Sequence, residues 1–202
     1  MKTVLFINSS IRGADSHSAQ LAQQFLAGLP ENSYKLNTID LGKNSLDHLD
    51  MNEMVAWMTP AEQRTAEQQA LAAISDNIIE QIKAADVILV GVPMYNFAIP
   101  SQLKAFLDRV ARAGVTFKYT EQGAVGLLEN KPVVILAARG GLYQGTPADS
   151  QTPFLTTFFN FVGLSDLHFV YAEGLAMGEE AVTKALTAAK ASLAELSSNI
   201  AA

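Results

Sequence analysis

The run from Val87 to Val92, with the sequence Val-Ile-Leu-Val-Gly-Val, constrains the fold of this chain more than any other stretch. It is apolar throughout and rich in β-branched residues, which is typical of a strand that is covered on both faces. Such strands occur mostly in parallel sheets that carry helices on either side. Pro93 follows at once, and Pro100 is suited to the first turn of a helix. The sequence therefore predicts a buried parallel strand that leads into a loop and then a helix.

Four more segments predict strands, and helical patterns separate them. The strands are expected at residues 4–7, 34–41, 132–138 and 167–171, and helices at residues 16–29, 100–114, 152–162 and 179–200. Strands that alternate with helices indicate an open α/β sheet, in which right-handed crossovers place the loops after the first, third and fourth strands at one edge. We expect one domain over residues 1–202, since a chain of this length can bury a substantial core.

A capping box predicts the start of the long helix before the Val87 strand. Thr59 is the expected cap, Pro60 takes the first helical position, and Glu62 stands three residues after the cap. Apolar residues recur from there at helical spacing as far as Ile82. We therefore expect a helix from about residue 60 to residue 82.

The remaining segments carry weaker patterns. Residues 42–58 have no clear period and are expected to form a surface excursion with short helical pieces, and residues 115–120 alternate like an inserted hairpin. Asp108 and Arg112 are four positions apart, so we expect them to pair on the outer face of their helix.

Charge and cysteine content restrict the possible partners. The net charge is −6, with 14 basic against 20 acidic residues, which argues against binding to nucleic acid or to an anionic membrane. There is no cysteine, so thiolate chemistry, thiolate metal sites and disulfides are excluded, and neither His48 nor His168 has the spacing of a metal site. No apolar run approaches the roughly 18 residues of a membrane span. A cytoplasmic protein with a small-molecule partner and no metal is expected.

The first loop lacks the common nucleotide-binding motifs. It has neither G-x-x-x-x-G-K-[ST] nor G-x-G-x-x-G, and it has no carboxylates where a phospho-acceptor domain needs them. It does offer the hydroxyls of Ser10, Ser16 and Ser18 near a helix N-terminus, where free backbone N–H groups favour an anion. These serines suit a phosphate monoester; the alternative is that Ser16 or Ser18 serves only as a helix cap.

The other two loops at this edge suit a flat, electron-accepting ring. Residues Met94-Tyr95-Asn96-Phe97 supply aromatic surface at a bend, and Arg139-Gly140-Gly141 supply backbone donors beside a cation. Taken alone, the aromatics also fit a core position and the glycines an ordinary turn. Together the three loops would suit a phosphate at one end and an electron-accepting ring at the other, whose anionic reduced form is stabilised by preoriented donors, and FMN fits that description.

At this point the sequence resembles a known family. The motifs at residues 93–97, Ser101-Gln102-Leu103-Lys104, residues 108–117 and 139–141 are similar to those of the FMN-dependent NADH:quinone oxidoreductases and NADH-azoreductases. The resemblance implies a flavodoxin-like three-layer sandwich with helices on both faces of a five-stranded parallel sheet in the order 2-1-3-4-5. It also implies a homodimer, one noncovalent FMN per subunit and NADH as the electron donor.

The same resemblance implies which residues contact FMN. These residues are Ser10, Ser16, His17, Ser18, Met94, Tyr95, Asn96, Phe97, Ala138, Arg139, Gly140 and Gly141. Ala138 has no side-chain hydroxyl, so its contact must come from the backbone, and His17 is expected to be a solvent-facing imidazole.

The function that the resemblance implies is NADH-dependent reduction of quinones by two electrons and reductive cleavage of aromatic azo compounds. Donor and acceptor use the same flavin face in turn, which predicts ping-pong kinetics. No side chain is expected to act as a catalytic group, and Asn96 and Tyr95 support the flavin. A flavodoxin-type electron-transfer protein and a noncatalytic α/β binding module remain as alternatives.

Overall fold

The computed structural model, which describes residues 1–201, is built on a parallel sheet of five strands in the order β2-β1-β3-β6-β7. The strands are β1 (Lys2–Asn8), β2 (Tyr34–Asp40), β3 (Val87–Pro93), β6 (Val133–Ala138) and β7 (Leu167–Ala172). Each is parallel to its neighbours. Numbered along the chain, this order is 2-1-3-4-5, so the predicted flavodoxin-like topology is confirmed.

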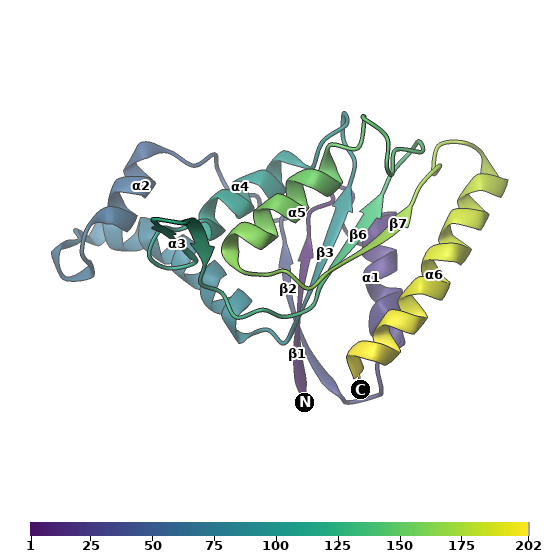
Figure 1. Ribbon diagram of the computed structural model, residues 1–202, viewed down its shortest axis with the longest axis horizontal. Helices are drawn as coiled ribbons and strands as arrows, with labels where there is room; N and C mark the ends of the chain where they lie inside the picture. The colour runs from purple at the N-terminus through teal and green to yellow at the C-terminus, as the bar shows by residue number, and fades with distance from the viewer. Residues whose placement is uncertain (202) are drawn as a thin grey trace.

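Helices cover both faces of the sheet (Figure 1). Helices α1 (His17–Ala27) and α6 (Glu179–Ala201) pack on one face, and α3 (Ala66–Ala84), α4 (Ser101–Val110) and α5 (Gln151–Val162) pack on the other. All helices within residues 1–201 are too short or too polar to cross a membrane.

Strand β3 is the centre of the molecule, and every one of its residues is buried. Successive side chains of a strand point to opposite faces, and β3 divides its residues between two apolar cores accordingly. Val87 and Leu89 lie in the core under α1 and α6, whereas Ile88 and Val90 lie in the core under α3, α4 and α5. The uninterrupted apolar run is therefore needed to fill two cores at once.

The start of α3 differs from the prediction. Thr65 caps this helix, and Thr65 and Gln68 form the capping box. Thr59 instead ends the preceding helix α2 (Met51–Met58), because its hydroxyl donates to the carbonyl of Val55 at 2.8 Å. Residues after Pro60 form only a short 3-10 turn, η2 (Ala61–Gln63).

The predicted pair between Asp108 and Arg112 is wrong. Helix α4 ends at Val110 rather than near Gly114, so Arg112 is no longer on the helix face. Its buried guanidinium forms an ion pair with Asp76 of α3 and lies 5.4 Å from the centre of the Trp57 ring. Asp108 pairs with Lys104, one turn earlier in α4.

Two excursions leave the central sheet. One is the segment with α2, which confirms the predicted helical piece and is held by a buried bidentate ion pair from Glu53 to Arg109 of α4, at 2.8 and 2.6 Å. The other is an antiparallel hairpin of β4 (Phe117–Thr120) and β5 (Gly123–Gly126), which confirms the predicted insertion. A 3-10 turn, η1 (Gly13–Asp15), precedes α1.

Candidate functional site

The carboxyl ends of β1, β3 and β6 meet at one edge of the sheet and enclose a cavity of about 190 Å³. Its lining comes from the loops that follow these strands and from the loop after β7. The lining residues are Ser10, Arg12, Ser16, His17, Ser18, Pro93, Met94, Tyr95, Ala138, Arg139, Gly140, Leu175 and Ala176. All predicted site residues except Asn96, Phe97 and Gly141 are among them.

The first wall is the N-terminus of α1. Ser16 caps this helix, since its hydroxyl oxygen accepts the N–H of Ala19 at 3.2 Å and donates to the carbonyl of Gly13 at 2.8 Å. Ser18 is fully buried, with its hydroxyl 3.4 Å from that of Ser16. The first N–H groups of a helix have no partner within it, and the helix dipole is positive at this end. Ser16 is thus a cap as well as part of a site suited to an anion.

His17 departs from its prediction. The imidazole is half-buried and lines the cavity rather than facing solvent. Its Nδ1 atom is shielded and has no hydrogen-bond partner within residues 1–201. A buried polar nitrogen without a partner is costly, so a ligand in the cavity is the natural partner for it.

Ser10 and Tyr95 join the first and second loops. Their hydroxyl oxygens lie 3.1 Å apart across the cavity, and the Ser10 hydroxyl also accepts the N–H of Arg12 at 3.2 Å. The loop after β2 supports this region closely, because a Cβ on Gly42 would lie 2.3 Å from the Ser10 carbonyl oxygen.

Residues 95–98 form a tight turn, here called the 95–98 turn, at the rim of the cavity. Tyr95 and Ala98 exchange two backbone hydrogen bonds of 3.0 Å. Asn96 and Phe97 are both left-handed, with φ values of 49° and 65°, as in a type I′ turn. No group within residues 1–201 accepts the N–H of either residue. Their side chains lie outside the cavity lining, but their backbone donors remain free at its rim.

The guanidinium of Arg139 is not a free cation. It is buried, and it donates to Gln151 at 3.0 Å, to Asp149 at 2.9 Å and to Glu173 at 3.0 Å. Burial alone raises the pKa of Asp149, but hydrogen bonds from Thr152 and Arg139 outweigh it and hold that pKa below its ordinary value. The charge of Arg139 is therefore compensated by carboxylates.

The prediction missed Arg12, Pro93, Leu175 and Ala176. The two last residues belong to the loop after β7, which hydrogen-bonds to the third loop from Leu175 to the Arg139 carbonyl at 3.1 Å and from Ala176 to the Gly140 carbonyl at 3.0 Å. The carboxyl ends of parallel strands meet at one edge of a sheet, and this rule also applies to the fifth strand. It could therefore have predicted that the loop after β7 lines the cavity.

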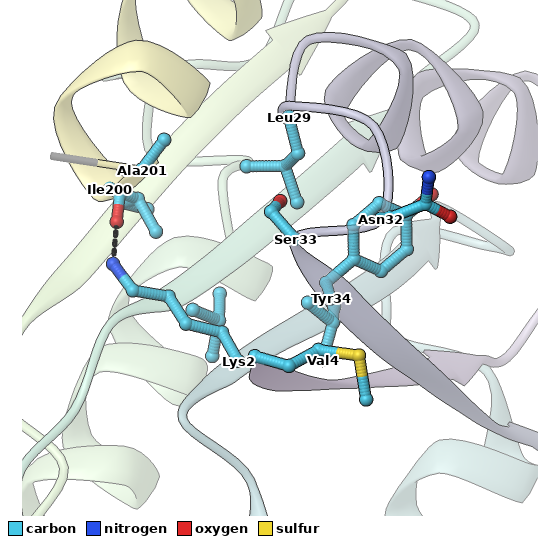
Figure 2. A pocket seen from close by; sticks show the side chains of 10 residues that line it. Lys2, Val4, Leu29, Asn32, Ser33, Tyr34, Ile200 and Ala201 are labelled. Atoms are coloured by element: carbon cyan, nitrogen blue, oxygen red, sulfur yellow. Dashed lines mark hydrogen bonds between the residues drawn. The ribbon is translucent and has the colours of Figure 1, made fainter.

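A larger cavity, of about 330 Å³, lies at the opposite, amino edge of the sheet (Figure 2). Val4, Leu29 and Tyr34 line it beside the end of α6, where the Lys2 ammonium donates to the carbonyl of Ile200. In Figure 1 both chain ends lie at this edge, away from the loops described above. Its mainly apolar lining holds none of the predicted site residues.

The residues at the carboxyl edge fit FMN. Among the described residues that line the cavity there is no acidic side chain, and Arg12 adds a positive charge. The N-terminus of α1, the serine hydroxyls and the unpartnered Nδ1 of His17 all suit a phosphate. The free N–H groups of Asn96 and Phe97 lie on the same edge and suit the polar atoms of a ring.

Comparison with known proteins identifies the family of this chain. A family model described as the flavodoxin-like fold matches residues 2–196. The chain is 54% identical to an FMN-dependent NADH:quinone oxidoreductase of Alteromonas mediterranea over 97% of this chain and 98% of that protein. It is 55% identical to a protein of the same name from Cellvibrio japonicus, over 89% and 92% of the two chains.

Solved structures show the same relationship. An FMN-dependent NADH-azoreductase from Bacillus anthracis, solved in complex with FMN, superposes with a TM-score of 0.86 at 30% identity and full coverage of both chains (100% and 100%). Another azoreductase from Bacillus anthracis gives a TM-score of 0.88 at 28% identity, over 98% and 100% of the chains. The chain therefore belongs to the family of the flavodoxin-like fold that includes the FMN-dependent NADH:quinone oxidoreductases.

Proposed function

We propose that this chain is an FMN-dependent oxidoreductase that uses NADH to reduce quinones and to cleave aromatic azo compounds. The observation that carries this proposal is the acid-free cavity at the carboxyl edge of the sheet, bounded by an α1 N-terminus and by a turn with two free N–H groups. The names of the relatives at 54% and 55% identity supply the reaction class.

In this proposal the phosphate of FMN binds at the start of α1. The hydroxyls of Ser10 and Ser18 and the first N–H groups of the helix donate to it, Ser16 borders it as the helix cap, and His17 turns its Nδ1 toward it. Tyr95 stands between the first two loops through its 3.1 Å contact with Ser10. The chain therefore fixes one end of the cofactor with neutral donors and a helix dipole.

The other end of the cofactor lies beside the two remaining loops. Met94 supplies apolar surface, Asn96 and Phe97 supply backbone donors, and the backbone of Ala138, Arg139, Gly140 and Gly141 completes the wall. When bound there, FMN would supply the two-electron chemistry that links NADH to the acceptor. The residues around it bind and orient; none of them has to act as a general acid, since solvent can protonate the product.

We propose that the active protein is a cytoplasmic homodimer and that residues 1–202 form one domain. Apolar side chains are exposed near the rim of the cavity, among them Ile11, Phe97 and Leu142, at 61%, 60% and 63% exposure. A second copy would cover such surface, and the segment of α2 and the hairpin of β4 and β5 would then help to wall the acceptor pocket.

Initial-rate kinetics test the proposed reaction. NADH and the acceptor use one site in turn, so reciprocal plots at several acceptor concentrations should give parallel lines. Intersecting lines would contradict a shared site. Comparing kcat/KM over a panel of quinones and azo dyes, each with NADH and with NADPH, identifies the preferred pair.

Two simpler observations separate this proposal from its alternatives. A flavodoxin-type carrier would not turn over NADH with a small quinone in the absence of a reductase. A noncatalytic module would purify colourless and release no flavin on heating. The proposed function requires yellow protein and turnover without a second protein.

A further inference from the structure

We propose that Gln151, at the start of α5, is a positioning residue for the 95–98 turn and links it to the buried guanidinium of Arg139. This inference rests on the proposed function and deepens it, since the 95–98 turn is the part of the site assigned to the flavin ring.

The contacts of Gln151 fix both ends of its amide. The side chain is 1% exposed. Its nitrogen donates to the carbonyl of Pro93, just before the turn, at 3.0 Å and to that of Ala98, its last residue, at 3.1 Å. Its oxygen accepts from Arg139 at 3.0 Å. The neighbouring Ser150 hydroxyl donates to the Phe97 carbonyl. The start of α5 therefore holds three carbonyls of the second loop.

Arg139 is a rigid anchor for this amide. Besides Gln151, its guanidinium is fixed by Asp149 and Glu173, and it lies 4.9 Å from the centre of the Tyr171 ring. Glu173 in turn accepts the N–H groups of residues 143 and 144, at 3.0 and 2.9 Å, in the third loop. Through Gln151 the second loop is joined to the third loop and to the loop after β7.

The 95–98 turn needs such support. Two successive residues, Asn96 and Phe97, are left-handed without being glycine, and this conformation persists only where the surroundings enforce it. With the flanking carbonyls held by Gln151, the free N–H groups of the turn keep one orientation. When that hold is removed, the turn can relax and these donors leave the position in which a flavin ring would meet them.

The test compares Q151M with a matched control, T152V. Gln151→Met removes the donors to the Pro93 and Ala98 carbonyls and the acceptor for Arg139, and it puts an apolar side chain of similar volume in their place. Thr152→Val removes a half-buried hydroxyl of the same network, which contacts Arg139 at 3.1 Å, Asp149 at 2.7 Å and Tyr171 at 3.0 Å but does not touch the turn. Both variants disturb the buried network, and only Q151M disturbs the turn.

The first readout is release of FMN from the holoenzyme on dilution, followed by flavin fluorescence. We expect the Kd for FMN to rise about tenfold or more in Q151M and to change less than about threefold in T152V. The second readout is hydrogen exchange of the Tyr95 and Ala98 N–H groups, each of which donates to the carbonyl of the other residue across the turn. These amides should exchange faster in Q151M and at the wild-type rate in T152V.

Equal effects of the two variants on both readouts would overturn the proposal, as would wild-type affinity and exchange in Q151M. If Q151M does not fold, Q151E replaces it, because a carboxylate keeps the acceptor for Arg139 and loses the two donors. If the wild-type protein neither holds nor takes up FMN, the proposed function fails, whereas the exchange comparison on the flavin-free protein still decides the role of Gln151.

Discussion

Several residues at the carboxyl edge have an unusual backbone conformation or a buried polar group. Asn96 and Phe97 are left-handed in succession, His17 has a shielded and unpartnered nitrogen, and Arg139 is wholly buried. Strain and unpartnered polar groups gather where a protein binds a ligand. At the residue scale, the site therefore combines left-handed backbone, an unpartnered nitrogen and a buried guanidinium at one edge of the sheet.

Replacing Asn96 by glycine separates the backbone of the turn from its side chain. Glycine accepts a positive φ without steric cost, so N96G should change the free energy of unfolding by less than about 1 kcal/mol. A β-branched residue there is strained, and N96V should lose about 1–2 kcal/mol. Urea denaturation measures both values.

The same N96G variant keeps the backbone N–H but loses the side-chain amide of Asn96, which is predicted to support the flavin. Reduction of FMN by NADH should therefore be slower than in the wild type in stopped-flow experiments. A wild-type rate of flavin reduction in N96G would remove the Asn96 side chain from the mechanism and leave only its backbone.

Asp149 gives the stability of the protein a specific dependence on acid pH. Its pKa in the folded state lies below the ordinary value of 3.8, so the ionised carboxylate contributes stability that is complete above the unfolded pKa. This contribution is lost as the pH falls through the folded pKa. The urea midpoint of the wild type should therefore decrease from about pH 5 to about pH 3.

Asp149→Asn is the comparison for this acid dependence. It should lower the free energy of unfolding at pH 7 by at most about 3 kcal/mol, since Glu173 still compensates Arg139. Its urea midpoint should then fall less steeply in acid. A slope equal to that of the wild type would mean that other carboxylates control acid unfolding.

At the scale of helices and strands, long patterns predicted structure well and short ones did not. The five strands, the inserted hairpin and the end of α5 at Gly163, whose φ is 103°, follow from hydrophobic period and glycine placement. The start of α3 was misplaced because Thr59 and Thr65 look equally like caps. Contacts decide between them, since α2 already uses the Thr59 hydroxyl.

A loop of the candidate site could be predicted from the sequence where the strand before it could be predicted. The loops after β1, β3 and β6 were found because their strands are clear in the sequence. The buried partners of Arg139 were not, since Asp149 and Gln151 follow the third loop at no recognisable spacing and are brought back by the start of α5. The bend at residues 94–97 was predicted, but its type I′ geometry was not, because neither of the central residues of the turn is glycine.

The end of α3 has an unusual cap that can be removed. The Lys131 ammonium donates to the carbonyls of Ile82, Lys83 and Ala85, at 3.1, 2.9 and 2.5 Å. Carbonyls at a helix C-terminus lack most of their helical partners, although that of Ile82 also accepts the N–H of Ala85 at 3.3 Å. Lys131→Met should therefore lower the free energy of unfolding by about 1–2 kcal/mol. Lys83→Met, which loses only an exposed pair with Glu80, should change it by less than about 0.5 kcal/mol. Thermal melts of the two variants make the comparison.

The hairpin is attached through a close contact of two backbones. A Cβ on Gly126 would lie 2.1 Å from the nitrogen and 2.4 Å from the Cα of Gly163, at the end of α5. Gly126→Ala should therefore lower the free energy of unfolding by about 2–3 kcal/mol. Gly91→Ala is the control, because its Cβ would meet only ordinary contacts at 3.4 Å or more. Equal losses in chemical denaturation would mean that the contact has little weight.

At the scale of the whole molecule, the candidate site and the chain ends lie at opposite edges of the sheet. The amino edge holds both chain ends, whereas the carboxyl edge holds the four loops and the exposed apolar side chains around them (Figure 1). Charge is low at the cavity, so binding there depends on backbone donors and apolar contact rather than on long-range attraction. Salt should consequently have little effect on the affinity for neutral quinones.

The proposed dimer is tested by light scattering after size-exclusion chromatography. The chain has a mass of 21.7 kDa, and we expect twice this mass over a wide range of concentration. A single-chain mass together with full turnover would contradict the view that the acceptor pocket needs a second copy.

The contact between Gly126 and Gly163 also sets the rules for redesign. The C-terminal end of helix α5 contacts the hairpin, and its N-terminal end contacts the 95–98 turn. One helix therefore connects the two features. An engineer who exchanges hairpins between relatives to change acceptor choice should place the junctions outside both glycines and leave α5 untouched. A residue larger than glycine at position 126 would displace the last turn of α5, and a shift of the whole helix would also move the 95–98 turn at the cofactor site.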